Sequence, residues 1–246
     1  MPSINSLIKN VPFKGTIKTL LFGSGEQERT VLAGALKGLR FCFDLRQDTQ
    51  MWRGVYERPL QQWLREHVEP GSTCLDVGAA AGYFTVLMAK LAGSDGAVYA
   101  FEPSELCERI TYHVELNKRS YTLAPVSAYK RFVVAQSDRS DPSSVSVDDI
   151  VQDASLNRVD IIKIDVDGAE ADVLRGAHRT LERFHPHLCV EVHSRDLLDE
   201  VQHIGSRYGY TFRLEDADPH EYRPIEYNAF LFSKGRRESR AASGEP

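Results

Sequence analysis

Residues 74–85 read CLDVGAAAGYFT, and this stretch decides the fold. The apolar segment at residues 73–77 predicts a strand, and the apolar run at residues 83–92 predicts a helix. Between them, Gly78 permits a tight turn after the strand, and Gly82 lets the helix begin close to a ligand. A strand, a small-residue loop and a helix in this order are typical of α/β sheets that bind a ligand at the carboxyl ends of their strands.

Short apolar segments alternate with amphipathic helices downstream of this stretch. Further strands are predicted over residues 97–101, 130–135, 159–165 and 187–193, and further helices over residues 58–68, 106–114, 173–181 and 197–204. This alternation predicts right-handed βαβ units and a mostly parallel sheet with helices on both faces, a three-layer α/β sandwich. Residues 210–214 and 229–233 predict two more strands without a helix between them, hence an antiparallel hairpin at the end of the sheet.

The chain divides into three parts by its patterning. Residues 1–50 are weakly patterned and predict an N-terminal cap with short strands within residues 30–45. Residues 51–233 hold the alternating pattern and form the main domain, and residues 234–246 predict a solvated, flexible tail. The loop at residues 215–227 mixes aromatic and acidic residues and is a candidate lining for an acceptor pocket.

The composition is that of a soluble globular protein. The 246 residues carry a net charge of −5, which argues against a nucleic-acid partner because phosphate binding favours a basic surface. No apolar run approaches the ~18 to 20 residues that span a bilayer, and no secretory leader is expected. The four cysteines are scattered without a C-x-x-C pair, which favours a reducing compartment and predicts a cytoplasmic protein. Oligomeric state is left open.

The acid before the loop distinguishes between cofactors. Asp76 gives the pattern D-x-G-x-x-x-G instead of the dinucleotide pattern G-x-G-x-x-G. A carboxylate there would repel a pyrophosphate and attract an ammonium group. S-adenosylmethionine (SAM) has an ammonium group and no phosphate, so it is the predicted cofactor, and a tight turn without a ligand is the alternative. The predicted loop contacts are Gly78, Ala79, Ala80, Gly82, Tyr83 and Phe84.

Two further strand ends add cofactor candidates. Glu102, followed by Pro103, ends the strand at residues 97–101 and is predicted to accept both ribose hydroxyls. Ser137 and Asp138 follow the segment at residues 130–135, and we expect them at the adenine edge, with an ordinary turn as the alternative. Glu57 precedes the helix at residues 58–68 and either reaches the amino-acid end of SAM or provides N-terminal helix charge.

The catalytic candidates lie on the next two strands. Asp165 ends one strand and is expected to hold either the substrate hydroxyl or the sulfonium side of SAM. Glu191 and His193 share a face at the end of the other strand. His193 is a candidate general base because imidazole accepts a proton near neutral pH. Lys163 lies in an apolar run and is expected to pair with a carboxylate, unless it snorkels at a sheet edge.

Two alternatives concern the roles of these acids. Asp165, Glu191 and His193 are also possible ligands for a hard divalent ion, although no dense ligand spacing supports a metal and none is predicted. Asp167 and Glu170 are expected to cap the helix that follows Asp165.

These residues resemble a known family. CLDVGAAAGYFT, VYAFEPS, VDIIKIDVDGAEADVLRGA and LCVEVH resemble the FkbM family of SAM-dependent methyltransferases, and RGVYE at residues 53–57 is similar to a segment upstream in that family. The resemblance spans residues 51–194 and is most specific in IKIDVDGAE. It implies a class I, Rossmann-like methyltransferase fold, a seven-stranded sheet whose last strand is antiparallel. Family members often carry Asn where this chain has Ala80.

The resemblance also implies the reaction. We expect O-methyl transfer from SAM to a hydroxyl of a small molecule or saccharide. The alternatives are a nicotinamide-dependent oxidoreductase on a related sheet and a non-catalytic protein of the same fold that serves as an interaction module. Asp76 and the missing third glycine argue against the oxidoreductase, while no residue excludes the interaction module.

Overall fold

The computed structural model of the protein describes residues 25–138, 140–216 and 227–233. Contacts between residues divide the chain into one unit that ends at Tyr56 and a second that begins at Glu57. The first 24 residues, the predicted tail and residues 217–226 of the loop between the last two strands lie outside the described residues.

The first unit contains a small antiparallel hairpin. Strand β1 (Gln27–Thr30) pairs with β2 (Arg40–Phe43), and helix α3 (Thr49–Arg53) follows. Phe41 and Phe43 are buried, whereas Arg40 is exposed. This alternation of inward apolar and outward polar residues is that of a two-sided strand. Short strands were expected within residues 30–45, and β2 lies there while β1 begins earlier.

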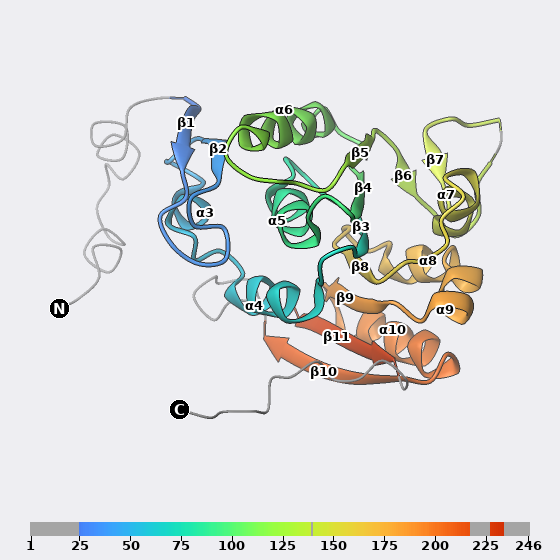
Figure 1. The fold of residues 1–246 in the computed structure, drawn as a ribbon. Helices are drawn as coiled ribbons and strands as arrows, with labels where there is room; N and C mark the ends of the chain where they lie inside the picture. The colour runs from blue at the N-terminus through green and yellow to red at the C-terminus, as the bar shows by residue number, and fades with distance from the viewer. Residues whose placement is uncertain (1–24, 139, 217–226, 234–246) are drawn as a thin grey trace. The chain divides into compact units, whose positions relative to one another are not determined.

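The second unit is built on a seven-stranded sheet with the order β10-β11-β9-β8-β3-β4-β5 (Figure 1). Its strands are β3 (Thr73–Val77), β4 (Ala97–Phe101), β5 (Val126–Tyr129), β8 (Ile161–Ile164), β9 (His187–Val192), β10 (Tyr210–Asp216) and β11 (Tyr227–Ser233). The five strands from β9 to β5 are parallel, and β11 runs antiparallel to both β9 and β10. The predicted mostly parallel sheet with an antiparallel last strand is therefore confirmed.

Helices cover both faces of this sheet (Figure 1). One face carries α4 (Arg58–His67), α5 (Tyr83–Ala92) and α6 (Leu106–Lys118), and the other carries α8 (Glu170–Arg175), α9 (His178–Phe184) and α10 (Arg195–Arg207). Apolar residues at helical spacing, such as Leu60 and Leu64, are buried as predicted. Leu106 is a correction, because it is 40% exposed and α6 buries Cys107, Ile110 and Val114 instead.

The third strand of the parallel sheet lies earlier in the chain than predicted. The sheet uses β5, Val126–Tyr129, while the predicted segment at residues 130–135 provides only β6 (Phe132–Val133). β6 pairs with β7 (Ser144–Val145) in a separate two-stranded sheet. The sequence VSAY has less apolar character than RFVVA, so hydrophobic patterning favours the wrong segment.

A single helix was expected over the apolar positions at residues 173–181, and the structure divides it into α8 and α9. A Cβ at Gly176 would lie 2.2 Å from the carbonyl oxygen of Val134, so the chain turns where another loop packs closely. A side chain of helix α7 (Val147–Asp153) then caps the start of α9. Asp148 Oδ1 accepts hydrogen bonds from the Thr180 N–H (2.8 Å) and from the Thr180 hydroxyl (2.7 Å). The break is thus a tertiary feature that the local pattern does not contain.

Asp148→Ala is expected to destabilise the protein. The change leaves the Thr180 N–H and hydroxyl without this acceptor, and loss of a capping carboxylate costs about 1 to 2 kcal/mol. Urea unfolding measures the effect, with Asp153→Ala as the control because Asp153 is an exposed residue at the end of the same helix. Equal stability of the two variants would show that Asp148 does not hold the start of α9.

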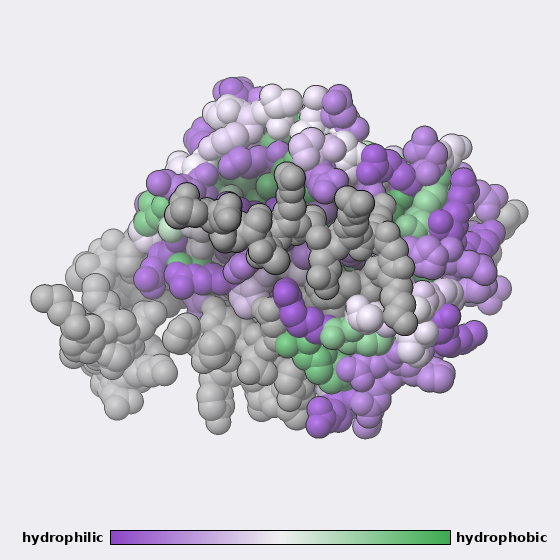
Figure 2. Space-filling model, turned by 60° about the horizontal axis from the view of Figure 1, so that its bottom comes forward, coloured by the Kyte–Doolittle hydropathy of each residue, from purple (hydrophilic) through white to green (hydrophobic). Residues whose placement is uncertain are grey.

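Where Figure 2 shows described residues, the surface is mainly hydrophilic. Figure 2 shows small, separate apolar areas among polar residues on the face it presents. The large hydrophobic side chains that are exposed are Leu32, Leu106, Tyr112, Phe132 and Leu214, which belong to different segments. Within the described residues, no helix combines the length and the apolar character needed to cross a membrane.

Candidate active site

The loop after β3 is held close to two neighbouring strands. The N–H groups of Gly78 and Ala79 both donate to the carbonyl oxygen of Phe101, the last residue of β4 (3.0 Å each). On the other side, a Cβ at Gly78 would lie 1.7 Å from the carbonyl oxygen of Asp165, and the φ of Gly78 is +79°. Glycine is therefore required at this position both by backbone conformation and by space.

The rest of the loop is also conformationally unusual. Ala80 has a φ of 46° and Gly82 a φ of 84°. Asparagine and glycine adopt this left-handed conformation more readily than alanine, which gives a physical reason for the Asn that family members often carry at position 80. His113 Nδ1 lies 2.8 Å from the carbonyl oxygen of Ala81, so helix α6 supports the loop from behind.

Glu102 lies beside this loop, as its position at the end of β4 predicts. Its Oε2 accepts a hydrogen bond from the Ala80 N–H, and its Oε1 accepts one from the Ser104 N–H, both at 2.9 Å. A carboxylate has about four acceptor positions, so each oxygen keeps capacity for one more donor. Glu102 can therefore hold the loop and accept two hydroxyl groups at the same time. Pro103 directly follows it in the chain.

Asp76 and Lys163 form a buried pair beneath the loop. They are register partners on β3 and β8, with Nζ 3.4 Å from Asp76 Oδ1, and Nζ also lies 3.3 Å from Asp165 Oδ2. The expectation of a carboxylate partner for Lys163 is confirmed. Burial disfavours the charge of Lys163, but the carboxylates of Asp165 and Asp76 outweigh burial and raise its pKa.

Asp76, whose charge is predicted to attract the ammonium group of SAM, is completely buried. It is 0% exposed, and its Oδ2 accepts a hydrogen bond from the Thr85 hydroxyl at 2.6 Å. In this structure Asp76 supports the loop and the buried lysine. Its effect on a bound ligand would be electrostatic and not by contact.

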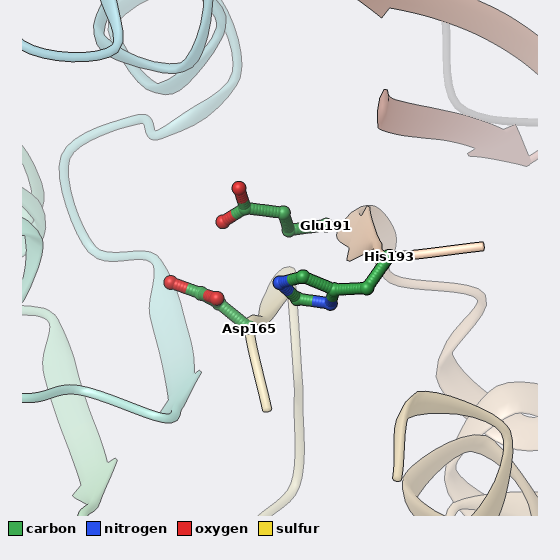
Figure 3. A group of neighbouring side chains, drawn as sticks. All are labelled: Asp165, Glu191 and His193. Atoms are coloured by element: carbon green, nitrogen blue, oxygen red, sulfur yellow. The ribbon is translucent and has the colours of Figure 1, made fainter. Parts of the chain in front are cut away.

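Asp165, Glu191 and His193 come together at the carboxyl ends of β8 and β9. Ile164 pairs with Val190, so Asp165 and Glu191 lie one residue beyond aligned positions of two parallel strands. One ligand atom of each of the three side chains lies within 4.8 Å of the others. Figure 3 shows Glu191 and His193 extending from β9 toward Asp165. The three catalytic candidates at the strand ends are thus neighbours.

The two carboxyl groups in this cluster have different electrostatic environments. Burial, followed by the charges of Asp165 and Glu57, raises the pKa of Glu191 to about 9. Burial acts on Asp165 in the same direction, but the positive charge of Lys163 together with hydrogen bonds from Glu191 and Lys163 outweighs it, so the pKa of Asp165 is lowered. The environment therefore favours an ionised Asp165 next to a protonated Glu191.

Glu170 belongs to this site although the sequence predicted only a cap. It is 0% exposed, and its Oε1 lies 2.9 Å from His193 Nδ1 and accepts a longer bond from the Gly168 N–H at 3.3 Å. A hydrogen bond at Nδ1 fixes the ring and leaves Nε2 directed toward the carboxyl groups of Asp165 and Glu191 (Figure 3). The sequence does contain a signal for this role of Glu170. Glu170 ends the segment IKIDVDGAE, which follows β8, and the neighbouring strand β9 leads to His193.

Three other predicted cofactor residues line the interior beside this site. Glu57 is 5% exposed with a φ of 43°, and its charge acts on Tyr83, Lys163 and Glu191. Tyr83 and Phe84 begin α5 and are buried, and the Phe84 ring centroid lies 5.9 Å from Lys163 Nζ. These two side chains contribute to the core next to the loop.

Ser137 and Asp138 do not follow the third strand of the main sheet, which corrects the prediction that placed them there. They follow β6, in the separate two-stranded sheet. Ser137 Oγ accepts a hydrogen bond from the Ser146 N–H at 2.6 Å, and Asp138 Oδ1 accepts one from the Ser140 N–H at 2.8 Å. This is the turn alternative, and the third strand of the main sheet ends at Tyr129 instead.

Comparison with known proteins decides the family. The sequence model described as the FkbM methyltransferase domain matches residues 76–212, more than half of the chain. The chain belongs to the FkbM methyltransferase family. The predicted family is therefore confirmed, and with it the assignment to the SAM-dependent methyltransferases. The family match therefore excludes the alternative of a nicotinamide-dependent oxidoreductase. No curated protein sequence matches the chain.

Solved structures with low sequence identity share the fold. The FkbM methyltransferase from Methylobacillus flagellatus is 18% identical with a TM-score of 0.53, over 70% of this chain and 50% of that one. A putative rRNA methylase from Clostridium thermocellum is 14% identical with a TM-score of 0.51, and the match covers 73% of this chain and 98% of that one. TYW2 from M. jannaschii, solved in complex with AdoMet, is 13% identical with a TM-score of 0.50, and the match covers 85% of this chain and 84% of that one.

These likenesses confirm the class I methyltransferase fold and do not identify an acceptor. The chain spans half the length of the M. flagellatus methyltransferase that it matches.

Proposed function

We propose that the protein transfers the methyl group of SAM to a hydroxyl oxygen of a small molecule or saccharide. The observation that carries the proposal is the cluster of Asp165, Glu191 and His193 at the sheet edge. The backbone of Asp165 lies against Gly78, so the cluster with its ionised Asp165 carboxylate stands beside the glycine loop. An acceptor hydroxyl needs a partner for its proton at that place.

The residues around the loop fit SAM. Glu102 keeps acceptor capacity for two ribose hydroxyls, and the loop beside it carries only the small side chains of Ala79, Ala80 and Ala81. The carboxylates of Glu57, Asp76 and Asp165 surround the single ammonium of Lys163, which leaves a surplus of negative charge for a cationic ligand. SAM, when bound, supplies a methyl group on a positively charged sulfur.

The reaction then depends mainly on position. The acceptor oxygen must lie about 3 Å from the methyl carbon and opposite the sulfur, so a fixed loop and a fixed cluster lower the barrier. As the new O–CH₃ bond forms and the S–CH₃ bond breaks, the hydroxyl proton passes to the Asp165–Glu191–His193 cluster. Lys163 and Glu170 position Asp165 and His193 from the protein interior.

RNA is a less favoured acceptor. One similar structure is a putative rRNA methylase, but at 14% identity this likeness concerns the fold. The net charge of −5 and the acidic cluster oppose the approach of phosphates.

Calorimetry with S-adenosylhomocysteine (SAH), followed by transfer assays with methyl-labelled SAM, tests the proposal. We expect SAH to bind and label to appear in hydroxyl acceptors from a panel of saccharides and small molecules. NADH should not bind. SAH binding without transfer to any hydroxyl would favour the non-catalytic interaction module, and absent SAH binding would overturn the proposal.

Glu102→Gln is expected to weaken SAH binding about 10- to 100-fold. Hydrogen bonds to a charged acceptor contribute about 1.5 to 3 kcal/mol each, and the amide replaces one acceptor oxygen with a donor. Glu105→Gln is the matched control, because Glu105 is an exposed acid nearby whose side chain pairs with Lys130. Unchanged SAH affinity in Glu102→Gln would remove Glu102 from the cofactor site.

A further inference from the structure

The geometry of the Asp165–Glu191–His193 cluster is suitable for a metal ion. Atoms bound to one ion at about 2.1 to 2.2 Å lie about 3.0 to 4.3 Å apart. The ligand atoms of the cluster lie within 4.8 Å of one another, so small side-chain rotations would close them around an ion. Asp165 and His193 are partly exposed, whereas Glu191 is buried, so the site is open on one side.

A second, independent observation lies behind His193. Glu170 is outside the cluster and completely buried, and its Oε1 holds His193 Nδ1 at 2.9 Å. Histidines that bind metals usually have their second nitrogen held by a carboxylate or a carbonyl group in this way. Nε2 is then left to face the two carboxyl groups, as Figure 3 shows.

The charges of the cluster also point to a cation. Ligand oxygens of Asp165 and Glu191 lie within 4.8 Å of each other, and a cation between the two carboxyl groups would offset their repulsion. Lys163 is shared between Asp76 and Asp165. One ammonium group between two carboxylates leaves negative charge in excess beside the cluster.

We propose that Asp165, Glu191 and His193 bind a divalent cation of the Mn²⁺ type, and that this ion binds the acceptor hydroxyl. One imidazole and two carboxylates suit an ion that accepts both nitrogen and oxygen ligands. Three protein ligands leave coordination positions for water or substrate, and a bound cation makes a hydroxyl easier to deprotonate. The proton then passes to a carboxylate oxygen that does not face the ion, while the O–CH₃ bond forms and the S–CH₃ bond breaks. The role of the ion rests on the proposed function, but the site itself does not.

Mn²⁺ titration followed by electron paramagnetic resonance tests the site directly on the full chain. We expect one Mn²⁺ to bind per chain, and His193→Ala and Glu191→Gln to abolish or strongly weaken binding. Glu170→Gln should weaken binding about 10- to 100-fold, as the loss of an outer carboxylate does in metal sites. Asp95→Asn is the control, because Asp95 is an exposed acid in the turn before β4. Thermal unfolding of each variant establishes that it is folded.

Several outcomes separate this inference from the proposed function. Absent Mn²⁺ binding, or equal binding in the wild type and in folded His193→Ala and Glu191→Gln, would overturn the metal site. Methyl transfer that persists after treatment with EDTA would overturn the role of the ion and leave the O-methyltransferase proposal intact. Mn²⁺ binding without SAH binding would support the site and contradict the proposed function.

Discussion

Gly78→Ala is expected to destabilise the protein by about 2 to 5 kcal/mol and to abolish SAH binding. The φ of Gly78 is +79°, and the new Cβ would lie 1.7 Å from the carbonyl oxygen of Asp165 and 2.7 Å from its carbon. These are backbone atoms, so the clash cannot be relieved by a side-chain rotation. The loop and the end of β8 must move apart, which would displace both the cofactor loop and the Asp165 carboxylate.

Gly209→Ala separates the clash from the backbone strain. Gly209 has a φ of +77°, but nothing lies within 4 Å of a Cβ placed there. Its replacement should cost about 1 to 2 kcal/mol, from the left-handed conformation alone. Urea unfolding of both variants and calorimetry with SAH measure the difference. If Gly78→Ala were no less stable than Gly209→Ala and still bound SAH, the loop would not depend on its contact with β8.

The sequence predicts this part of the site well because local chemistry determines it. The strand and helix next to Gly78 were predicted with the bounds that the structure has, 73–77 and 83–92. The positions of Glu102 and Asp165 then follow from one rule, that the carboxyl ends of parallel strands meet at one edge of the sheet. The same rule brings His193 to Asp165, because β8 and β9 are neighbours.

Sequence reasoning fails where a distant contact decides the structure. β5 is selected by its hydrogen bonds to β4 and not by its own apolar content. The break between α8 and α9 depends on Asp148 from another helix. Glu170 has the position of a helix cap, and only the folded chain shows its contact with His193. In each case the local pattern is compatible with two structures, and tertiary packing selects one.

Lys163→Met is expected to destabilise the protein by about 3 to 5 kcal/mol. Methionine has a similar length and keeps the packing against Phe84, so the change removes mainly the charge. Lys163 is 3% exposed, and its loss leaves Asp76, which is 0% exposed, without its cationic partner. The cost is the free energy of a buried, uncompensated carboxylate. For a domain of this size, the melting temperature should fall by about 6 to 20 °C.

A surface pair and a double variant make this expectation specific. Lys118→Met removes a lysine that is 47% exposed and paired with Glu115, and such exposed pairs contribute less than about 1 kcal/mol to the free energy of unfolding.

Asp76→Asn combined with Lys163→Met should recover part of the stability lost in Lys163→Met, because the uncompensated charge is removed as well. The double variant should still bind SAH less tightly than the wild type, since Lys163 also donates to the Gly78 carbonyl at 3.1 Å. A double variant no more stable than Lys163→Met would mean that packing, and not charge, keeps lysine at this position. The buried ion pair thus joins the two halves of the proposed site, since the same ammonium group contacts the carbonyl of Gly78 in the glycine loop and the carboxylate of Asp165, which we propose faces the acceptor.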